Sequence, residues 1–128
     1  MEAPVAQFRF VGYKILESNV SLTEDVTLFQ NLKINIEQQN GGESEENRYK
    51  HIIAVTIKDE SDSVKIYVKM VGLFGYDKGI DESTKKNFFN GNAPAILFPY
   101  IRAYISALTS LSGIPTIILP TLNLAKML

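Results

Sequence analysis

Cysteine is absent from this chain of 128 residues, and histidine occurs once. Without cysteine there is no disulfide framework, no thiol nucleophile and no zinc ribbon. Lysine plus arginine (13) nearly balance aspartate plus glutamate (14), so the chain lacks both the basic excess of a nucleic-acid-binding protein and the charge blocks that bind lipid surfaces. We find no charged leader followed by an apolar run, the pattern that is typical of a signal peptide. We therefore expect a cytoplasmic protein.

Charge is scarce in the C-terminal third of the chain. Between Phe88 and Ala125 the one charged residue is Arg102, although 21% of all residues are charged. A domain this small has only one small core, so a stretch this apolar would leave apolar surface exposed unless another chain or a ligand covered it. The sequence therefore predicts self-association or the binding of apolar partners.

This stretch is nevertheless a poor candidate for a membrane span. Residues 103–125 carry no charge, but three serines, three threonines and the helix breakers Gly113, Pro115 and Pro120 interrupt them. A transmembrane helix needs about 20 consecutive, predominantly apolar residues. We predict that the protein does not insert into a membrane.

Residues 92–113 have the periodicity of an amphipathic helix. Five apolar residues recur at gaps of four, three, four and three: Leu97, Ile101, Tyr104, Leu108 and Leu111. Three more widen this stripe: Ile96, Tyr100 and Ile105. We therefore expect the helix to pack on its own sheet with one side and on another helix with the other.

The ends of this helix also have sequence signals. Asn92 is suited to cap it, and Pro94 fits its first turn. Pro99 lacks a backbone N–H and crowds the preceding turn, so we expect the helix either to kink there or to be regular only from that point on. Gly113 followed by Pro115 predicts its end.

The N-terminal half alternates apolar and polar residues as β-strands do. Four segments each have one apolar face: residues 8–22, 31–37, 49–57 and 64–70. The alternation changes phase within residues 8–22, which indicates a bulged or bent strand. Asn40-Gly41-Gly42 and the acidic residues after it would join the second and third strands, and Asp59–Ser63 would join the third and fourth as a tight turn.

These segments predict one domain over residues 1–128, with 45% hydrophobic residues to build an ordinary core. Residues 23–30 would cross from the first strand to the second. Residues 76–90, with Asp81 as a cap, would lead into the long helix through a short helical piece. The expected fold is α+β: a four-stranded antiparallel sheet with one long C-terminal helix packed on one face.

No catalytic constellation emerges from the residue inventory. His51 lies in the apolar phase of a strand, where a hydrogen-bonded core histidine is far more common than a general base. The glycines between the fourth strand and the helix lack the Gly-Lys-Ser/Thr run of a phosphate loop. Asp77, Asp81 and Glu82 precede a helix, where capping and solvated surface explain them better than a metal site. We predict a protein without enzymatic activity, cofactor or metal.

The C-terminal third resembles one known family. The run Leu97-Phe-Pro-Tyr100 has Arg102 two residues on, and Gly113-Ile-Pro115 and the ending Leu122-Asn-Leu124 follow. This compound pattern resembles the SecB family of protein-export chaperones, and weaker matches upstream extend the resemblance over nearly the whole chain. It implies a homotetramer, built as a dimer of dimers, in which the helices lie between two sheets.

The resemblance also implies an activity. Such a protein holds unfolded or non-native polypeptides without ATP, either for preprotein export or for one dedicated partner such as an antitoxin. The alternative from another class is a structural oligomer of the same fold that binds no client.

The expected sites follow from this comparison and from the apolar pattern. Clients would contact grooves lined by the crossover and the C-terminal tail: Val26, Leu28, Phe29, Ile114, Ile117, Leu119, Leu122 and Leu124. The oligomer interface would use the helix: Leu97, Tyr100, Ile101, Arg102, Tyr104, Ile105, Leu108 and Leu111. As the lone charge on that helix, Arg102 is expected either to extend to solvent or, preferably, to pair with a carboxylate or carbonyl across an interface.

The SecA motor is a doubtful partner on the same grounds. Export members of the family continue into a second helix and a polar tail that contacts SecA, whereas this sequence ends four residues after Leu124. They also present acidic residues to SecA on the sheet face, and the matching positions here are Asn19, Thr23 and Tyr67. These differences argue against coupling to SecA.

Overall fold

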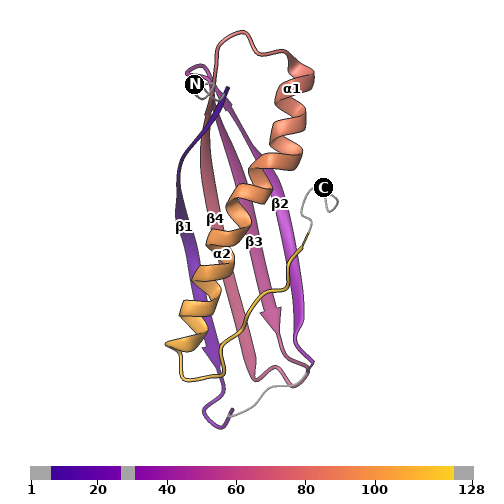
Figure 1. Ribbon diagram of the computed structural model, residues 1–128. Helices are drawn as coiled ribbons and strands as arrows, with labels where there is room; N and C mark the ends of the chain where they lie inside the picture. The colour runs from indigo at the N-terminus through magenta and orange to yellow at the C-terminus, as the bar shows by residue number, and fades with distance from the viewer. Residues whose placement is uncertain (1–6, 27–30, 123–128) are drawn as a thin grey trace, which may run out of the picture.

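The computed structural model describes residues 7–26 and 31–122 of the chain. Four strands come first: β1 (Phe8–Leu22), β2 (Lys33–Ser44), β3 (Arg48–Lys58) and β4 (Val64–Tyr76). They form one antiparallel sheet in the order β1-β4-β3-β2. The helical elements follow one another directly: α1 (Glu82–Asn87), the π-helical η1 (Phe88–Asn92) and α2 (Ala93–Ser110). They lie on one face of the sheet (Figure 1), which confirms the predicted α+β fold.

Strand β1 has the irregularity that its sequence predicts. Its pairing with β4 shifts register at two places, and each shift adds one residue to β1: Val11 at the first and Leu16 at the second. A bulge of this kind bends the strand, and its extra side chain interrupts the alternation of side chains between the two faces of the sheet. Val11 and Leu16 are accordingly 49% and 50% exposed, although both are apolar.

Strand β2 is longer than its sequence predicts. The run Asn40-Gly41-Gly42 was expected to leave the sheet, but β2 continues through it and the turn falls at residues 45–47. A bulge takes up the glycines, and Gly42 has a φ of 98°, which glycine adopts without steric penalty. Glu43 is thereby placed to accept a hydrogen bond of 2.6 Å from the hydroxyl of Tyr76.

The helix boundaries confirm one predicted cap and correct another. Asp81 caps α1, because its carboxylate accepts a hydrogen bond of 3.2 Å from the backbone N–H of Thr84. Asn92 makes no capping hydrogen bond, because η1 leads straight into α2 and the chain is already helical there. Helix α2 also starts well before Pro99 and runs through it. Because Pro99 has no N–H, the carbonyl of Ala95 lacks its usual helical hydrogen bond. Both residues are exposed, so water can hydrogen-bond to this carbonyl instead.

The core lies between α2 and the sheet. The inward-facing side chains of β3 and β4 have no exposed area: Ile53, Val55, Ile57, Val64, Ile66, Val68 and Met70. Leu97, Ile101 and Ile105 from α2 are also 0% exposed. Part of the apolar stripe predicted from the sequence is therefore core within a single protomer.

One glycine sets how closely α2 approaches the sheet. Gly72 on β4 lies directly against Leu97, so that a Cβ atom at position 72 would lie only 2.3 Å from Leu97 Cδ2. Leu97 is completely buried, and a close-packed interior leaves it no free volume to move into. The absence of a side chain at Gly72 is therefore a condition for this packing.

Replacing Gly72 with alanine is expected to lower the free energy of unfolding by about 1–3 kcal/mol, because helix and strand must move apart. Gly91→Ala is the matched control, since nothing lies within 4 Å of the corresponding Cβ, and it should leave stability unchanged or slightly raised. Denaturant titration measures both. Leu97→Ala should destabilise the Gly72→Ala protein less than the wild type; equal losses in both backgrounds would contradict the proposed contact.

A buried polar chain links β2 and β3 on the inner side of the sheet. His51 is 1% exposed, and its Nδ1 accepts a hydrogen bond of 2.7 Å from the hydroxyl of Tyr49. Its Nε2 donates to the Gln38 Oε1 at 2.8 Å, which places the ring proton on Nε2 because an amide oxygen only accepts. Burial lowers the pKa of His51 to about 4 and raises the pKa of Tyr49 to about 12. The prediction of a hydrogen-bonded core histidine is confirmed.

This histidine predicts a loss of stability in mild acid. The unfolded chain binds a proton on His51 near pH 6.5, whereas the folded protein binds it only near pH 4. The unfolded state therefore takes up the proton first as pH falls, and the free energy of unfolding should decrease by about 1–3 kcal/mol between these values. Denaturant titrations at pH 7, 6 and 5 would measure the slope.

The His51→Phe variant is the control for this prediction. It lacks the titrating group, so its stability should change little between pH 7 and 5, whatever its absolute value. The carboxylates with lowered pKa, Glu43, Asp59 and Asp81, start from ordinary values of 4.5 or less and act below this window. A wild type with the same slope as the variant would contradict the prediction.

Candidate functional site

Beyond α2 the chain reverses and runs back along the helix. Gly113, with a φ of 85°, makes the reversal possible at low steric cost. The following residues, 114–122, which we call the tail, are extended and lie on the same side of the sheet as α2 (Figure 1). The tail crosses in front of β3 towards β2.

Side chains of α2 hold the backbone of the tail. Arg102 Nε donates to the carbonyl of Leu119 at 2.7 Å, and Ser106 Oγ donates to the carbonyl of Ile117 at 3.1 Å. Thr109 Oγ1 accepts from the N–H of Ile117 at 2.9 Å. These bonds satisfy tail backbone groups that would otherwise be buried without partners. Arg102 thus pairs with a carbonyl of its own chain, which corrects the expectation of a contact across an interface.

The tail buries alternate side chains. Ile117 and Leu119 are 4% and 0% exposed, whereas Ile118 between them is 65% exposed. Ile114, Ile117 and Leu119 are core residues of the protomer, and their predicted place in a client groove stays a prediction. Sequence reasoning missed Ile118, although the two-residue alternation of an extended chain would have indicated it.

The other predicted client-binding residues fall into two groups. Val26 and Leu122 are partly buried against the core, so part of each side chain stays accessible. Leu28, Phe29 and Leu124 lie outside the described residues. The site that the structure describes is therefore the tail and its surroundings.

The predicted interface residues of α2 also divide. Leu97, Ile101 and Ile105 are completely buried against their own sheet and belong to the core, and their predicted role at an oligomer interface stays a prediction. Tyr104 and Leu108 are partly buried beside the core. Tyr100 and Leu111 are 40% and 88% exposed and remain available to a partner.

Tyr100 and Tyr104 are held by strand β1. The ring of Tyr100 packs on Phe10 and Tyr13, with centroid distances of 5.3 and 4.8 Å. The hydroxyl of Tyr104 donates a hydrogen bond of 2.8 Å to Ser18 Oγ. These contacts fix both aromatic side chains in place while leaving part of their surface accessible.

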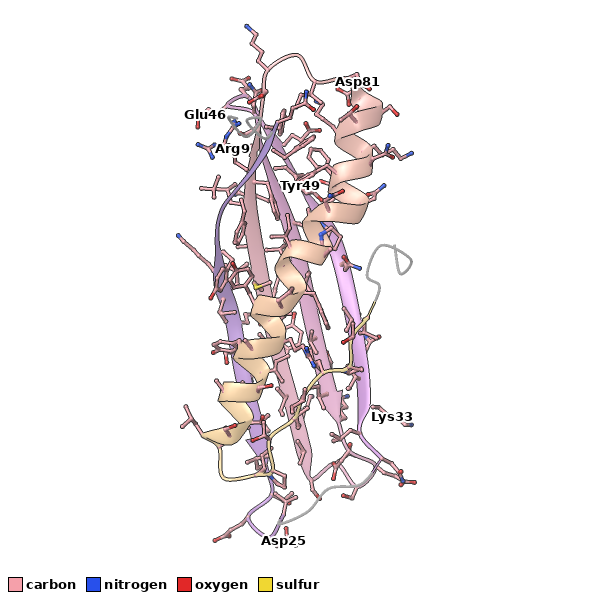
Figure 2. All side chains as sticks on the ribbon, in the orientation of Figure 1. Arg9, Asp25, Lys33, Glu46, Tyr49 and Asp81 are labelled. Carbon is pink, nitrogen blue, oxygen red and sulfur yellow. The ribbon has the colours of Figure 1, made fainter. Side chains whose placement is uncertain are left out.

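The outer surface of α2, its C-cap and the tail is largely apolar, with one partly exposed charge, Arg102. Tyr100, Leu111 and Ile118 are its most exposed large apolar side chains. Arg102 is the only charge on α2, and its guanidinium group is engaged by the tail. Figure 2 shows the labelled charged residues, such as Arg9, Asp25 and Lys33, around the ends of the molecule.

This surface has the chemistry of a binding site for apolar segments.

Within residues 7–26 and 31–122, no group of three or more His, Cys, Asp or Glu side chains could hold a metal ion. No helix in the same part of the chain is long and apolar enough to cross a membrane.

Sequence comparison places this arrangement among known proteins. The family model for SecB, preprotein translocase subunit SecB, matches residues 15–128. An uncharacterized protein of Methanocaldococcus jannaschii is 32% identical over 135 residues, which cover the whole chain and 87% of that protein. The protein-export protein SecB of Alcanivorax borkumensis is 31% identical over 96 residues, which cover 73% of this chain and 60% of that protein.

Two solved structures have a similar fold. The SecB-like chaperone of Mycobacterium tuberculosis, in complex with a ChAD peptide from the HigA1 antitoxin, matches with a TM-score of 0.72 and 18% identity over 91% of both chains. A protein of unknown function from Streptococcus agalactiae matches with a TM-score of 0.55 and 9% identity, over 92% of this chain and all of that one. At these identities the likeness shows the fold alone. The family model and the sequence relatives go further: the chain belongs to the SecB family.

Proposed function

We propose that this protein is a holdase, an ATP-independent chaperone that binds unfolded or non-native polypeptides. The tail carries the proposal, because its apolar residue Ile118 is 65% exposed there. Ile34, Ile36 and Leu122 on the same side of the sheet are only partly buried, and apolar area left exposed in this way can mark an interaction site. Membership of a family of chaperones supports the same activity.

The geometry suits an extended client. The tail is itself extended, and β2 is an edge strand whose inner residues Ile34 and Ile36 are only partly buried. An extended segment can bond to an edge strand through its main chain while its alternate side chains enter apolar pockets. Each contact is weak because the client loses conformational entropy, so repeated sites on one oligomer would raise the avidity.

Two kinds of client are consistent with this proposal. One is the preprotein of an export pathway. The other is a single dedicated partner, in the way that the SecB-like chaperone of Mycobacterium tuberculosis holds a peptide from an antitoxin. We do not include SecA among the partners, because Asn19 and Tyr67, which face each other across β1 and β4, present no acidic group.

Neighbouring isoleucines in the tail test the client site. Ile118→Ser removes an exposed side chain, so the melting temperature should hold while suppression of aggregation of an unfolded protein, measured without nucleotide, should fall severalfold. Ile117→Ala removes a buried one and should lower the free energy of unfolding by about 2–4 kcal/mol, with activity per folded molecule unchanged. Light scattering and thermal denaturation measure the two effects.

The structural-oligomer alternative predicts a different result. A protein of that kind would not suppress aggregation even as wild type, and Ile118→Ser would then change nothing. Full activity of the Ile118→Ser protein would show that clients do not bind at Ile118, and it would contradict this site.

We further propose that the protein is a homo-oligomer, such as a dimer of dimers, and that the outer side of α2 provides its interface. Leu111→Glu would place a charge against the partner copy and should shift the protein to smaller species. In an isolated protomer the position is exposed, so folding should be unaffected. Ser83→Glu adds the same charge at an exposed position on α1 and is the control. Light scattering after size-exclusion chromatography measures the mass, and an unchanged mass for Leu111→Glu would contradict this interface.

A further inference from the structure

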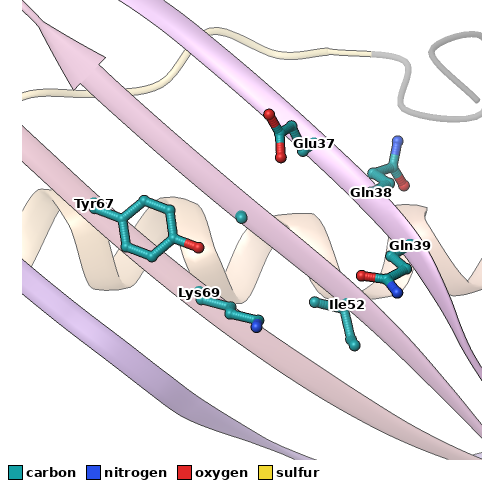
Figure 3. Close-up of a pocket in the computed structure, with 7 residues that line it drawn as sticks. Glu37, Gln38, Gln39, Ile52, Tyr67 and Lys69 are labelled. Carbon is teal, nitrogen blue, oxygen red and sulfur yellow. The ribbon is translucent and has the colours of Figure 1, made fainter.

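None of the described helices lies on the face of the sheet opposite α2, and Figure 3 views the sheet from this open side with a helix behind it. A hollow of about 670 Å³ lies on this face across β1, β4 and β3. Its lining includes five aliphatic side chains: Val11, Leu16, Ile52, Val71 and Leu73. A smaller hollow of about 290 Å³, drawn in Figure 3, shares Ile52 with it and is more polar, with Glu37 and Lys69 in its lining.

The two bulges of β1 shape the larger hollow. Val11 and Leu16 are the extra residues of these bulges, and both are about half exposed: 49% and 50%. In a regular strand two residues five positions apart would face opposite sides of the sheet, whereas the bulges bring Val11 and Leu16 to the same hollow. Neither side chain belongs to the core cluster under α2, so the packing of the protomer does not explain them.

The rim of the hollow is basic. Lys14 and Lys50 line it, and Arg48 joins Lys50 in an adjoining hollow of about 260 Å³ that shares Leu73 with the first. None of the three makes an ion pair within the described part of the chain. The carboxylate in the adjoining hollow, Glu43, already accepts from Tyr76 and Lys85.

A second arginine lies beside Arg48, but an aspartate neutralises it. The guanidinium groups of Arg9 and Arg48 converge over Gly75, where a Cβ atom would lie 3.1 Å from Arg48 Nη1 and 3.7 Å from Arg9 Nη2. Arg9 pairs with Asp77 at 2.7 Å. Arg48 has no such partner among the described residues and stays available to an incoming anion.

We propose that this hollow binds an acidic polypeptide segment, with a large apolar side chain of the segment in the hollow and its carboxylates on Lys14, Lys50 and Arg48. Charge complementarity selects this occupant: free cations surround an aliphatic floor, and a peptide with acidic residues on both sides of an apolar one matches both features. A nucleic acid would match the cations alone. The proposal concerns the open face and does not depend on the holdase activity of the opposite side.

The test uses the full chain and fluorescence anisotropy with a labelled peptide that has a Leu-Phe centre between runs of Asp and Glu. The wild type should bind it, and binding should weaken as salt is raised. The Lys14→Gln, Lys50→Gln double variant should bind about tenfold more weakly, and Val11→Ser should also bind more weakly. Lys33→Gln removes an exposed lysine of β2 that lies outside these hollows and should leave binding unchanged.

Several results would overturn the proposal. They are no binding by the wild type, equal binding of a peptide with Lys and Arg in place of the acidic residues, or equal binding when Ser-Gly replaces the Leu-Phe centre. An oligonucleotide of equal charge that binds as tightly would make the face a general polyanion site. A Val11→Ser protein of altered oligomer size would make it an interface between copies of this chain.

Discussion

The contact of Leu97 with Gly72 determines how the rest of the molecule is arranged. It lets α2 lie directly on β4, so that the buried stripe of the helix closes the core over the centre of the sheet. A single helix does not cover all four strands, and the tail covers more of the inner face beside it. Ile114, Ile117 and Leu119 enter the core there, and the apolar side chains left outside become the accessible surface.

The tail is attached in a way that suits this role. Pairing with a strand would have bonded the tail backbone at every second residue along its whole length, whereas Arg102, Ser106 and Thr109 bond it only at Ile117 and Leu119. Ile118 thus projects outwards from a segment that is anchored at the residues on either side of it. The lone charge on α2 serves this anchoring, which explains how a charged residue sits in an otherwise uncharged helix without a carboxylate partner among the described residues.

Local patterns were enough to predict most of the fold. Alternation gave the strands, the phase change within residues 8–22 gave the bulges of β1, and the spacing of apolar residues gave the long helix. The functional assignment of those apolar residues was less reliable. Leu97 and Leu111 belong to the same stripe, yet Leu97 packs on Gly72 and is buried, whereas Leu111 lies just past the last residue of α2 and is 88% exposed. That information lies in the tertiary contact and not in the spacing.

Glycine and the tail show the same limit. Asn40-Gly41-Gly42 has the composition of a turn, but the pairing of β2 with β3 extends past it, and the left-handed conformation of Gly42 serves a bulge instead. The tail has no helical periodicity, and its apolar residues alternate over too few positions to predict a strand. Its alternation predicts burial only when the chain is known to be extended, and that depends on the contacts with α2.

The sheet separates two surfaces of different chemistry. The side with α2 and the tail exposes apolar side chains, and the one charge of α2, Arg102, is bonded to the tail. This suits the proposed clients, which are unfolded segments of varied sequence. The open side combines aliphatic residues with unpaired cations, which favours one kind of partner over others. Strands β3 and β4 contribute alternate residues to both, so neighbouring positions such as Ile52 and Ile53 serve opposite faces. A substitution on one face therefore leaves the side chains of the other face in place, so the two proposed binding surfaces can be tested separately.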